Sequence, residues 1–197
     1  MAVGQVNAND PRVKRTRKLL QQTLLDLMHE KSFAAITVQD IAERSTLNRA
    51  TFYAHFEDKY DLLDSIMREG VEQALAATIS DTAPVTADTL RTLCRTVVDY
   101  LAQVQDHCRP RDKQFDPLLE KAVQDVLQGF VRRWLQRAPP SALPPDVDVE
   151  TVAAVISWAI FGVGSQWSRG LRTQPADEVA AQVVAVLTDG VAALVAP

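Results

Sequence analysis

A short stretch near residue 50 carries side chains suited to reading the edges of DNA bases. Arg49 can reach the acceptors of guanine or a phosphate, and the small Ala50 allows close approach and can touch a thymine methyl group. Asn48, Thr51 and Tyr53 add short or polar side chains close by. A recognition helix needs such side chains near its N-terminus in order to enter the major groove. This group therefore predicts base contacts.

Other side chains around it carry donors suited to phosphate oxygens. Tyr53, His55 and Lys59 offer a hydroxyl, an imidazole and an ammonium group, and Thr37 could hold a phosphate through its hydroxyl and backbone N–H at a helix N-terminus. Taken singly, each residue is better explained by packing or as an ordinary surface group. Taken together at this spacing, they favour a surface that binds nucleic acid.

A basic run, Arg12–Lys18, stands at the start of the first expected helix and contains no acid. The helix macrodipole disfavours cations at that end, so stability alone does not explain the run. We interpret it as an arm that contacts phosphates, with Arg15 and Arg17 among the contacts; a merely solvated helix end is the alternative. The whole chain has a net charge of −4, yet residues 12–59 hold nine Lys and Arg against six Asp and Glu.

The elements that position these residues read as helix, turn, helix. Thr37, with Asp40 three residues later, is a capping signature for a short helix that stops near Ser45. Asn48 can cap the next helix, which runs from Arg49 to Phe56 and buries Phe52 and Phe56 on its inner side. A three-residue turn between two such helices predicts a helix-turn-helix.

Apolar residues at three- and four-residue steps predict helices through the rest of the chain, and we expect an all-α fold. Residues 1–11 lack this pattern and end in Asp-Pro, which predicts a disordered lead-in. Ala83-Pro84 and the proline-rich stretch 138–148 predict loops. The expected longer helices are 13–31, 59–77, 87–107, 116–137, 149–169 and 175–195.

Composition excludes several classes of protein. With 197 residues, 47% apolar and 23% charged, the chain is typical of a soluble globular protein. We find neither an apolar run of about 18 residues, as a membrane span needs, nor an apolar signal core at the start, so we expect no membrane and a cytoplasmic location. Cys94 and Cys108 cannot build a disulfide framework; Cys108, in a basic cluster, is better explained as part of a solvated loop than as a redox sensor.

Catalysis is not indicated by the residues. The three His have no metal-type spacing, and we find no nucleophile–base set and no phosphate loop. We therefore expect no enzyme activity, no metal and no cofactor.

Three segments of the sequence carry a family resemblance: Ile36–Arg44, Thr51–Phe56 and Lys59–Leu63. They resemble the DNA-binding end of tetracycline-repressor (TetR) family regulators over residues 14 to 66. The resemblance implies an all-α homodimer with a three-helix reader over 12–58, a helical regulatory and dimerisation domain over 59–197, and repression of a roughly palindromic operator that a small molecule relieves. Whether it represses or activates is left open.

The positions that contact DNA in the family match residues of this sequence whose side chains already predict DNA contacts. Thr37, Tyr53, His55 and Lys59 match positions that hold phosphates, whereas Asn48, Arg49 and Ala50 match positions that face bases. The chain departs from the family in the turn, where Ser45-Thr46-Leu47-Asn48 replaces the frequent Ala-Gly-Val-Ser. Glycine adopts a positive φ at a lower energetic cost than threonine does. This turn is therefore where the chain departs most from the family.

The last two expected helices are similar to those that pair into a four-helix dimer interface in the family. Glycine inside a helix costs up to about 1 kcal/mol, which a close helix–helix approach can offset. A buried helix of a monomer is the alternative. The expected interface residues are Gly162, Gly164, Trp167, Val183 and Leu187.

Six aromatic residues of the second half could line an effector cavity, because such cavities are mostly apolar. Core packing explains them at least as well. They are Tyr100, Phe115, Phe130, Trp134, Trp158 and Phe161.

The sequence thus predicts a dimeric DNA-binding regulator. A TetR-like co-activator that binds protein and has no operator of its own is the first alternative, and a small helical enzyme is the second.

Overall fold

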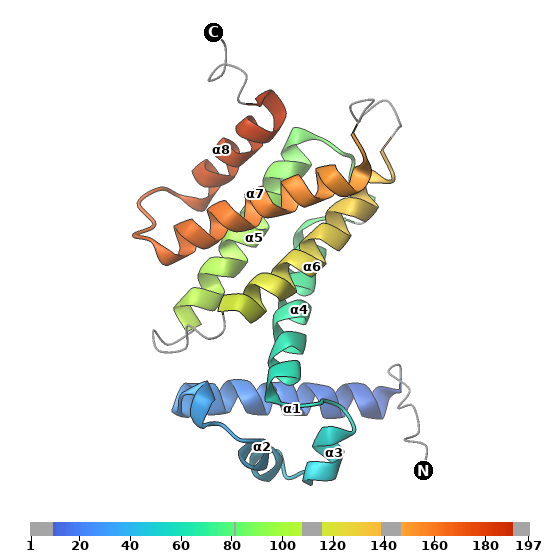
Figure 1. The fold of residues 1–197 in the computed structure, drawn as a ribbon, viewed down its shortest axis with the longest axis vertical. Coiled ribbons are helices and arrows are strands. Elements are labelled where there is room, and N and C mark those ends of the chain that lie inside the picture. The colour runs from blue at the N-terminus through green and yellow to red at the C-terminus, as the bar shows by residue number, and fades with distance from the viewer. Residues whose placement is uncertain (1–9, 81, 108–115, 139–146, 191–197) are drawn as a thin grey trace. The chain divides into compact units, whose positions relative to one another are not determined.

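The computed structural model describes residues 10–80, 82–107, 116–138 and 147–190, and this part of the chain is all-α, as predicted (Figure 1). Two compact units divide within one helix, between Met67 and Arg68. The helices are α1 (Pro11–Glu30), α2 (Val38–Arg44), α3 (Arg49–Tyr53), α4 (Lys59–Thr78), α5 (Ala87–His107), α6 (Asp116–Leu135), α7 (Val149–Arg169) and α8 (Ala176–Asp189), with a 3-10 turn at Phe33–Ala35.

The first unit folds around one apolar core. In it α1 packs on α2, and α2 packs on α3 (Figure 1). Phe33 and Ile36, between α1 and α2, are fully buried and so belong to this core. The other large side chains with no more than 2% exposure are Leu20, Leu24, Ile41, Phe52, Phe56, Leu62 and Leu63.

The start of α1 corrects the expected lead-in. Asp10 is the N-cap: its carboxylate accepts the Arg12 N–H at 2.8 Å, and Pro11 is the first helical residue. Proline suits that position because its missing N–H would have no partner there. Asp-Pro is therefore a helix start here, two residues before the expected one. Residues 1–9 of the expected lead-in lie outside the described residues.

The turn between α2 and α3 places a threonine in the left-handed region. Thr46 has a φ of 58°. Its N–H donates to the carbonyl of Glu43 at 3.1 Å, and the Leu47 N–H donates to that of Ala42 at 3.0 Å. These two bonds form a Schellman motif, whose left-handed residue is usually glycine. Thr46 stands where the family frequently has that glycine.

We expect Thr46→Gly to stabilise the first unit by about 1 kcal/mol, because a β-branched residue in the left-handed region costs about 1–3 kcal/mol. Chemical denaturation followed by circular dichroism measures the effect. Thr46→Ala is the matched control: it loses the same 2.6 Å hydroxyl bond to the Ser45 carbonyl but keeps a Cβ. A Gly variant no more stable than the Ala variant would contradict the account.

The second unit is built on α5 and α7. Helix α7 packs on α5, α6 and α8, and α5 also packs on α8 (Figure 1). Gly164 permits the approach of α7 to α5, because a Cβ there would lie 3.1 Å from Leu101 Cδ1 and 3.3 Å from Val98 Cγ2. The two compact units divide after Met67, inside α4. The predicted domain boundary, between residues 58 and 59, lies earlier, at the start of that helix.

Helix boundaries in the second half follow the sequence closely. Helices α5 and α7 begin and end where expected, while α6 ends at Leu135 rather than 137. Pro175 is the N-cap of α8 and not its first residue, and α8 ends at Asp189 because Gly190, with a φ of 70°, stops it. Among the described helices, α7 alone is long and apolar enough to cross a membrane. It packs on three other helices, while part of its apolar surface stays exposed.

Candidate nucleic-acid interface

Helix α3 turns a small set of polar side chains outward. Asn48 caps it, as predicted: the Asn48 side-chain oxygen accepts the Thr51 N–H at 2.6 Å and the Thr51 hydroxyl at 2.9 Å. Phe52 is fully buried and fixes the inner side of α3. Arg49, Ala50 and Asn48 are exposed and Thr51 is half-buried. The predicted base-contacting residues Asn48, Arg49 and Ala50 are therefore all exposed at the start of α3.

Arg49 and Tyr53 form a pair on this surface. Arg49 Nη2 lies 3.5 Å from the Tyr53 hydroxyl, and the guanidinium carbon lies 5.9 Å from the centre of the tyrosine ring. Tyr53 is 50% exposed, so the pair is solvated and its geometry is loose. Both residues therefore keep donors that can turn toward a base edge or a phosphate.

Thr37 and Asp40 form the predicted capping box of α2. The Thr37 hydroxyl and N–H both donate to Asp40 Oδ2 at 2.7 Å, and the Asp40 N–H donates back to the hydroxyl at 3.1 Å. The two donors that the sequence assigns to a phosphate are therefore already bonded to a carboxylate. The hydrogen bonds from Thr37, followed by Lys31, lower the pKa of Asp40 from 3.8 to about 2.

This carboxylate gives the first unit a pH dependence. Because the folded-state pKa of Asp40 is depressed, its stabilising contribution is complete above about pH 4 and is lost as the pH falls toward about 2. We expect Asp40→Asn to cost about 1 kcal/mol at neutral pH, as the loss of a helix cap does, and to flatten the acid side of the stability profile. Urea denaturation at pH 7, 4 and 3 measures both, with the exposed Asp26→Asn as control. Equal acid sensitivity in Asp40→Asn and the unsubstituted protein would refute the assignment.

Lys59 faces inward rather than toward solvent. Its ammonium group donates to the carbonyls of Phe33, Ala34 and Ile36 at 2.9, 3.3 and 2.7 Å. It also lies 4.6 Å from the centre of the Phe33 ring. Desolvation lowers the pKa of Lys59, although Asp40 and Asp58 oppose that shift. The three donors of this group are therefore all occupied by backbone carbonyls.

Arg17 and His55 lie together where α3 ends. Arg17 Nη1 donates to the His55 carbonyl at 2.9 Å, and the guanidinium stacks 4.2 Å from the centre of the Phe56 ring. Desolvation, followed by the positive charge of Arg17, lowers the pKa of His55 below its usual 6.5. This lowered pKa favours the neutral imidazole at pH 7 in the chain without DNA.

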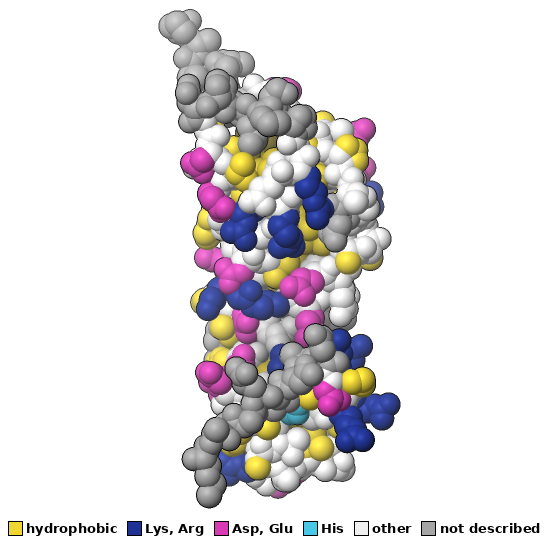
Figure 2. Space-filling model, turned by 90° about the vertical axis from the view of Figure 1, so that its right-hand side faces the viewer, with side chains coloured by type: hydrophobic (Ala, Val, Ile, Leu, Met, Phe, Trp, Pro, Cys, Tyr) yellow, Lys and Arg dark blue, Asp and Glu magenta, His cyan; other side chains and the backbone are white. Residues whose placement is uncertain are grey.

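The other bases of the run at the start of α1 remain exposed. Figure 2 shows Lys and Arg side chains gathered over the beginning of this helix, where Arg12, Lys14, Arg15 and Lys18 are all exposed. Arg17 is the half-buried member of the run. The structure therefore separates one inward-facing arginine from four bases that solvent, or a phosphate backbone, can reach.

The five described aromatic residues of the six expected at an effector cavity do not line one common cavity. Tyr100 lines a groove of about 600 Å³ beside α4 and α5, Phe130 lines one of about 270 Å³ beside α4 and α6, and Trp158 and Phe161 line one of about 550 Å³ on α6 and α7. Trp134 is buried, and its ring N–H donates to the Ala83 carbonyl at 2.9 Å. Phe115 lies outside the described residues. Helical spacing alone did not show which helix faces meet.

The expected dimer residues are divided between the core and the surface. Gly162 is open, with nothing within 4 Å of a Cβ placed there, whereas Gly164 packs on α5 and Val183 is buried. Trp167 and Leu187 are half-buried. Two residues that this expectation omitted complete an exposed apolar stripe on α7, Val155 at 55% and Trp158 at 53% exposure. Val155, Trp158 and Gly162 follow one another at steps of three and four residues, and this spacing was the available signal.

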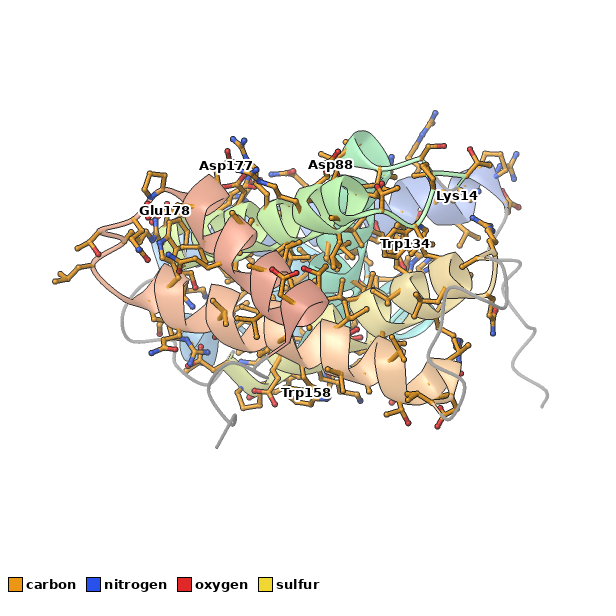
Figure 3. The ribbon with its side chains drawn as sticks, turned by 90° about the horizontal axis from the view of Figure 1, so that it is seen from above. Lys14, Asp88, Trp134, Trp158, Asp177 and Glu178 are labelled. Atoms are coloured by element: carbon orange, nitrogen blue, oxygen red, sulfur yellow. The ribbon has the colours of Figure 1, made fainter. Side chains whose placement is uncertain are left out.

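Figure 3 shows the two tryptophans in different settings. Trp134 lies between helices, while Trp158 lies on the outer side of α7. Trp158 makes an edge-on contact with Phe161, with ring centres 6.3 Å apart. An indole half exposed on a helix face is a feature of surfaces that bind other proteins.

The described residues offer neither a metal-binding group nor a reactive cysteine. Residues 10–80, 82–107, 116–138 and 147–190 contain no group of three His, Cys, Asp or Glu that could hold a metal ion. Burial raises the pKa of the Cys94 thiol to about 12, so this cysteine stays protonated. Cys108 lies outside the described part of the chain.

Comparison with known proteins finds a family similarity in the first unit. Residues 22–66, which include α2 and α3, match the family model of bacterial regulatory proteins, tetR family. The uncharacterized HTH-type transcriptional regulator YxbF of Bacillus subtilis (strain 168) is 40% identical over 67 residues, which are 34% of this chain and 18% of that protein. The chain thus matches less than a fifth of that relative's length.

Solved structures share the fold over most of the chain. A putative TetR-family transcriptional regulator from Syntrophomonas wolfei has a TM-score of 0.61 at 20% identity, with 93% of this chain and 99% of that chain covered. The regulator FadR from Bacillus subtilis, in complex with stearoyl-CoA, has a TM-score of 0.57 at 17% identity, with 88% and 98% covered. At these identities the likeness establishes the fold alone.

Proposed function

We propose that this chain, whose residues 22–66 match the family model of bacterial regulatory proteins, tetR family, acts as a dimeric, sequence-specific transcriptional repressor that a small-molecule effector releases from DNA. The outward surface of α3 is the observation that carries this proposal. There Arg49, Ala50 and Tyr53 stand exposed on a helix capped by Asn48 and anchored by the buried Phe52. A short, well-anchored helix with small and polar outer residues fits the major groove.

Base and phosphate contacts divide between α3 and α1 in this proposal. Arg49 and Asn48 read base edges, Ala50 allows the backbone to approach, and Thr51 and Tyr53 add contacts at the groove edge. The exposed bases at the start of α1, Arg15 among them, supply non-specific attraction to the phosphate backbone.

Two copies would pair through α7 and α8. The stripe of Val155, Trp158 and Gly162 is exposed and apolar in the single chain, and Val186 on α8 is 54% exposed. A two-fold axis through such a face makes the same patch meet itself. Two reading heads related by that axis call for a roughly palindromic operator with half-sites one or more helical turns apart.

An effector would act through the second unit. FadR of Bacillus subtilis, a neighbour in fold, was solved with stearoyl-CoA. By analogy, we propose that a small molecule binds among α4–α8 of this chain. Helix α4 contributes residues to both units and is the direct covalent link between them. The effector shifts the balance between DNA-competent and DNA-incompetent forms only by its differential affinity for them.

Selection of bound fragments from random duplex DNA, followed by equilibrium binding at several salt concentrations, tests the proposal. We expect a recurring, roughly palindromic sequence, bound with an affinity that falls steeply with salt, by about 0.9 log units per neutralised phosphate and per log unit of salt. A co-activator that binds only protein would enrich no DNA. Because its target is chromosomal DNA, we place the regulator in the cytoplasm.

A further inference from the structure

We propose that the groove beside α4 and α5 binds a small molecule that carries a carboxylate on an apolar body, and that this ligand takes the place of the Asp177 side chain between two arginines. The inference deepens the effector part of the proposed function and rests on that function for the link to DNA. The groove has a volume of about 600 Å³, and all the residues that line it belong to the second unit. Among them are Arg91, Arg95 and Asp177.

Two contacts between α4 and α5 lie on either side of a short side chain in this groove. The hydroxyl oxygens of Thr78 and Thr96 lie 2.9 Å apart and join the two helices. Tyr100 lies so close to Gly70 that a Cβ on the glycine would be 2.8 Å from the tyrosine hydroxyl oxygen. Between these positions the groove wall on α4 is Ala74, whose methyl group leaves space and offers an apolar surface to a ligand.

A carboxylate already lies between the two arginines and shows which anion they fit. Asp177, in the first turn of α8, accepts from Arg91 Nη2 through Oδ2 at 3.2 Å and from Arg95 Nη1 through Oδ1 at 3.1 Å (Figure 3). Each guanidinium thus has one oxygen of the same planar group. Arg91 and Arg95 are four residues apart, so they stand on the same side of α5. Their spacing therefore suits a carboxylate.

The Asp177 carboxylate is a replaceable occupant of this position. The side chains of Arg91, Arg95 and Asp177 are 46, 55 and 50% exposed, and ion pairs at such exposure contribute little to stability. A ligand carboxylate would make the same two bonds and would also bury its apolar body against the wall at Ala74. Burial of that body favours the ligand over the aspartate.

Exchange at this position would act on α8. Asp177 is the second residue of α8, which packs on α5 and α7. While the aspartate is bonded to the arginines, the first turn of α8 is tied to α5, and a ligand in its place removes that tie. The ligand therefore has a higher affinity for the untied form, which is the differential affinity that an effector needs. Helix α8 also carries Val186, part of the proposed pairing face, so the change would reach the dimer.

Isothermal titration calorimetry of the DNA-free protein with octanoate and with phenylpropanoate tests the site. We expect Arg91→Gln and Arg95→Gln each to weaken binding by about tenfold or more, because a charge-assisted hydrogen bond to the ligand is lost. Asp177→Asn should strengthen binding by about fivefold, because it removes the competing carboxylate. All three substitutions weaken the same tie between α5 and α8, so a merely structural role would not give opposite signs.

Two controls accompany these variants, and circular dichroism checks that each variant is folded. Arg132→Gln removes a comparable exposed ion pair outside the groove, 3.6 Å from Glu150, and should leave binding unchanged. Octanol, which has the chain of octanoate without its charge, should bind at least about tenfold more weakly. The inference is overturned if neither acid binds the unsubstituted protein or Asp177→Asn, if octanol binds as tightly as octanoate, if the groove arginine variants bind the acids as Arg132→Gln does, or if Asp177→Asn does not bind them more tightly.

The link to DNA is measured separately, as operator affinity with and without a saturating concentration of the acid that binds more tightly. We expect that acid to lower the affinity by about tenfold, a typical coupling between two sites. If it binds as described but leaves operator affinity unchanged, the carboxylate site stands and the proposed release by an effector fails. If the protein selects no DNA, the proposed function fails, and calorimetry still decides whether the site exists.

Discussion

Trp158→Glu is expected to separate the proposed dimer into monomers and to reduce operator affinity by more than about a hundredfold. The indole lies 53% exposed on the outer side of α7, in line with Val155 and the open Gly162. A second copy seated on this stripe would bury the new carboxylate without a partner, which costs several kcal/mol. A dimer that places two DNA-binding units on one operator binds far more tightly than a single unit does. Loss of pairing therefore lowers the affinity for the operator.

Sedimentation equilibrium measures the pairing, and fluorescence anisotropy with the selected operator measures the binding. Leu171→Glu is the matched control: this leucine is 94% exposed in the connection after α7 and lies off the apolar stripe. The control should remain dimeric with unchanged affinity. A Trp158→Glu protein that stays dimeric would move the interface away from this face.

Ala50→Glu is expected to abolish operator recognition, again by about a hundredfold or more, without loss of stability. Ala50 is exposed on α3, one residue from Arg49, so a side chain added there disturbs no core contact. In the major groove it would keep the helix from the base edges and set a carboxylate among phosphates. Such like-charge contact costs several kcal/mol at an interface. Anisotropy titration gives the affinity, and thermal denaturation checks the fold.

The same substitution elsewhere controls for the change in charge. Ala87→Glu places a carboxylate at the first position of α5, where an acid suits the helix dipole. It should leave operator binding within about twofold, as a surface substitution away from the interface does. Comparable losses in both variants would mean that net charge, and not the position on α3, governs binding.

Local signals in the sequence predict where the helices of the helix-turn-helix begin, although α3 ends at Tyr53 and not at the expected Phe56. The capping box of Thr37 and Asp40 and the cap at Asn48 are confirmed because both depend on residues three positions apart, which sequence shows directly. The inner positions of Phe52 and Phe56 follow from helical periodicity in the same way. Asp10 and Pro11 carry an equally local signal, the cap followed by the first-turn proline, but the prediction from sequence places them in a disordered lead-in.

Long-range contacts explain what the sequence could not show. Lys59 reaches carbonyls more than 20 positions earlier, and Arg17 reaches a carbonyl 38 positions later. Nothing in the spacing of a basic residue distinguishes such a bond from an exposed phosphate contact. The aromatic residues of the second unit are a similar case, since their periodicity identifies an apolar side but not the helix it meets.

Hydroxyl-radical footprinting of the selected operator, with the full chain bound at saturation, tests the central claim most directly. Two reading heads joined by a two-fold axis should protect two half-sites on one side of the duplex, with centres about 34–36 Å or a whole multiple apart. Ala50→Glu should remove both protections together. Protection of a single half-site, or of the DNA uniformly along its length, would contradict the account.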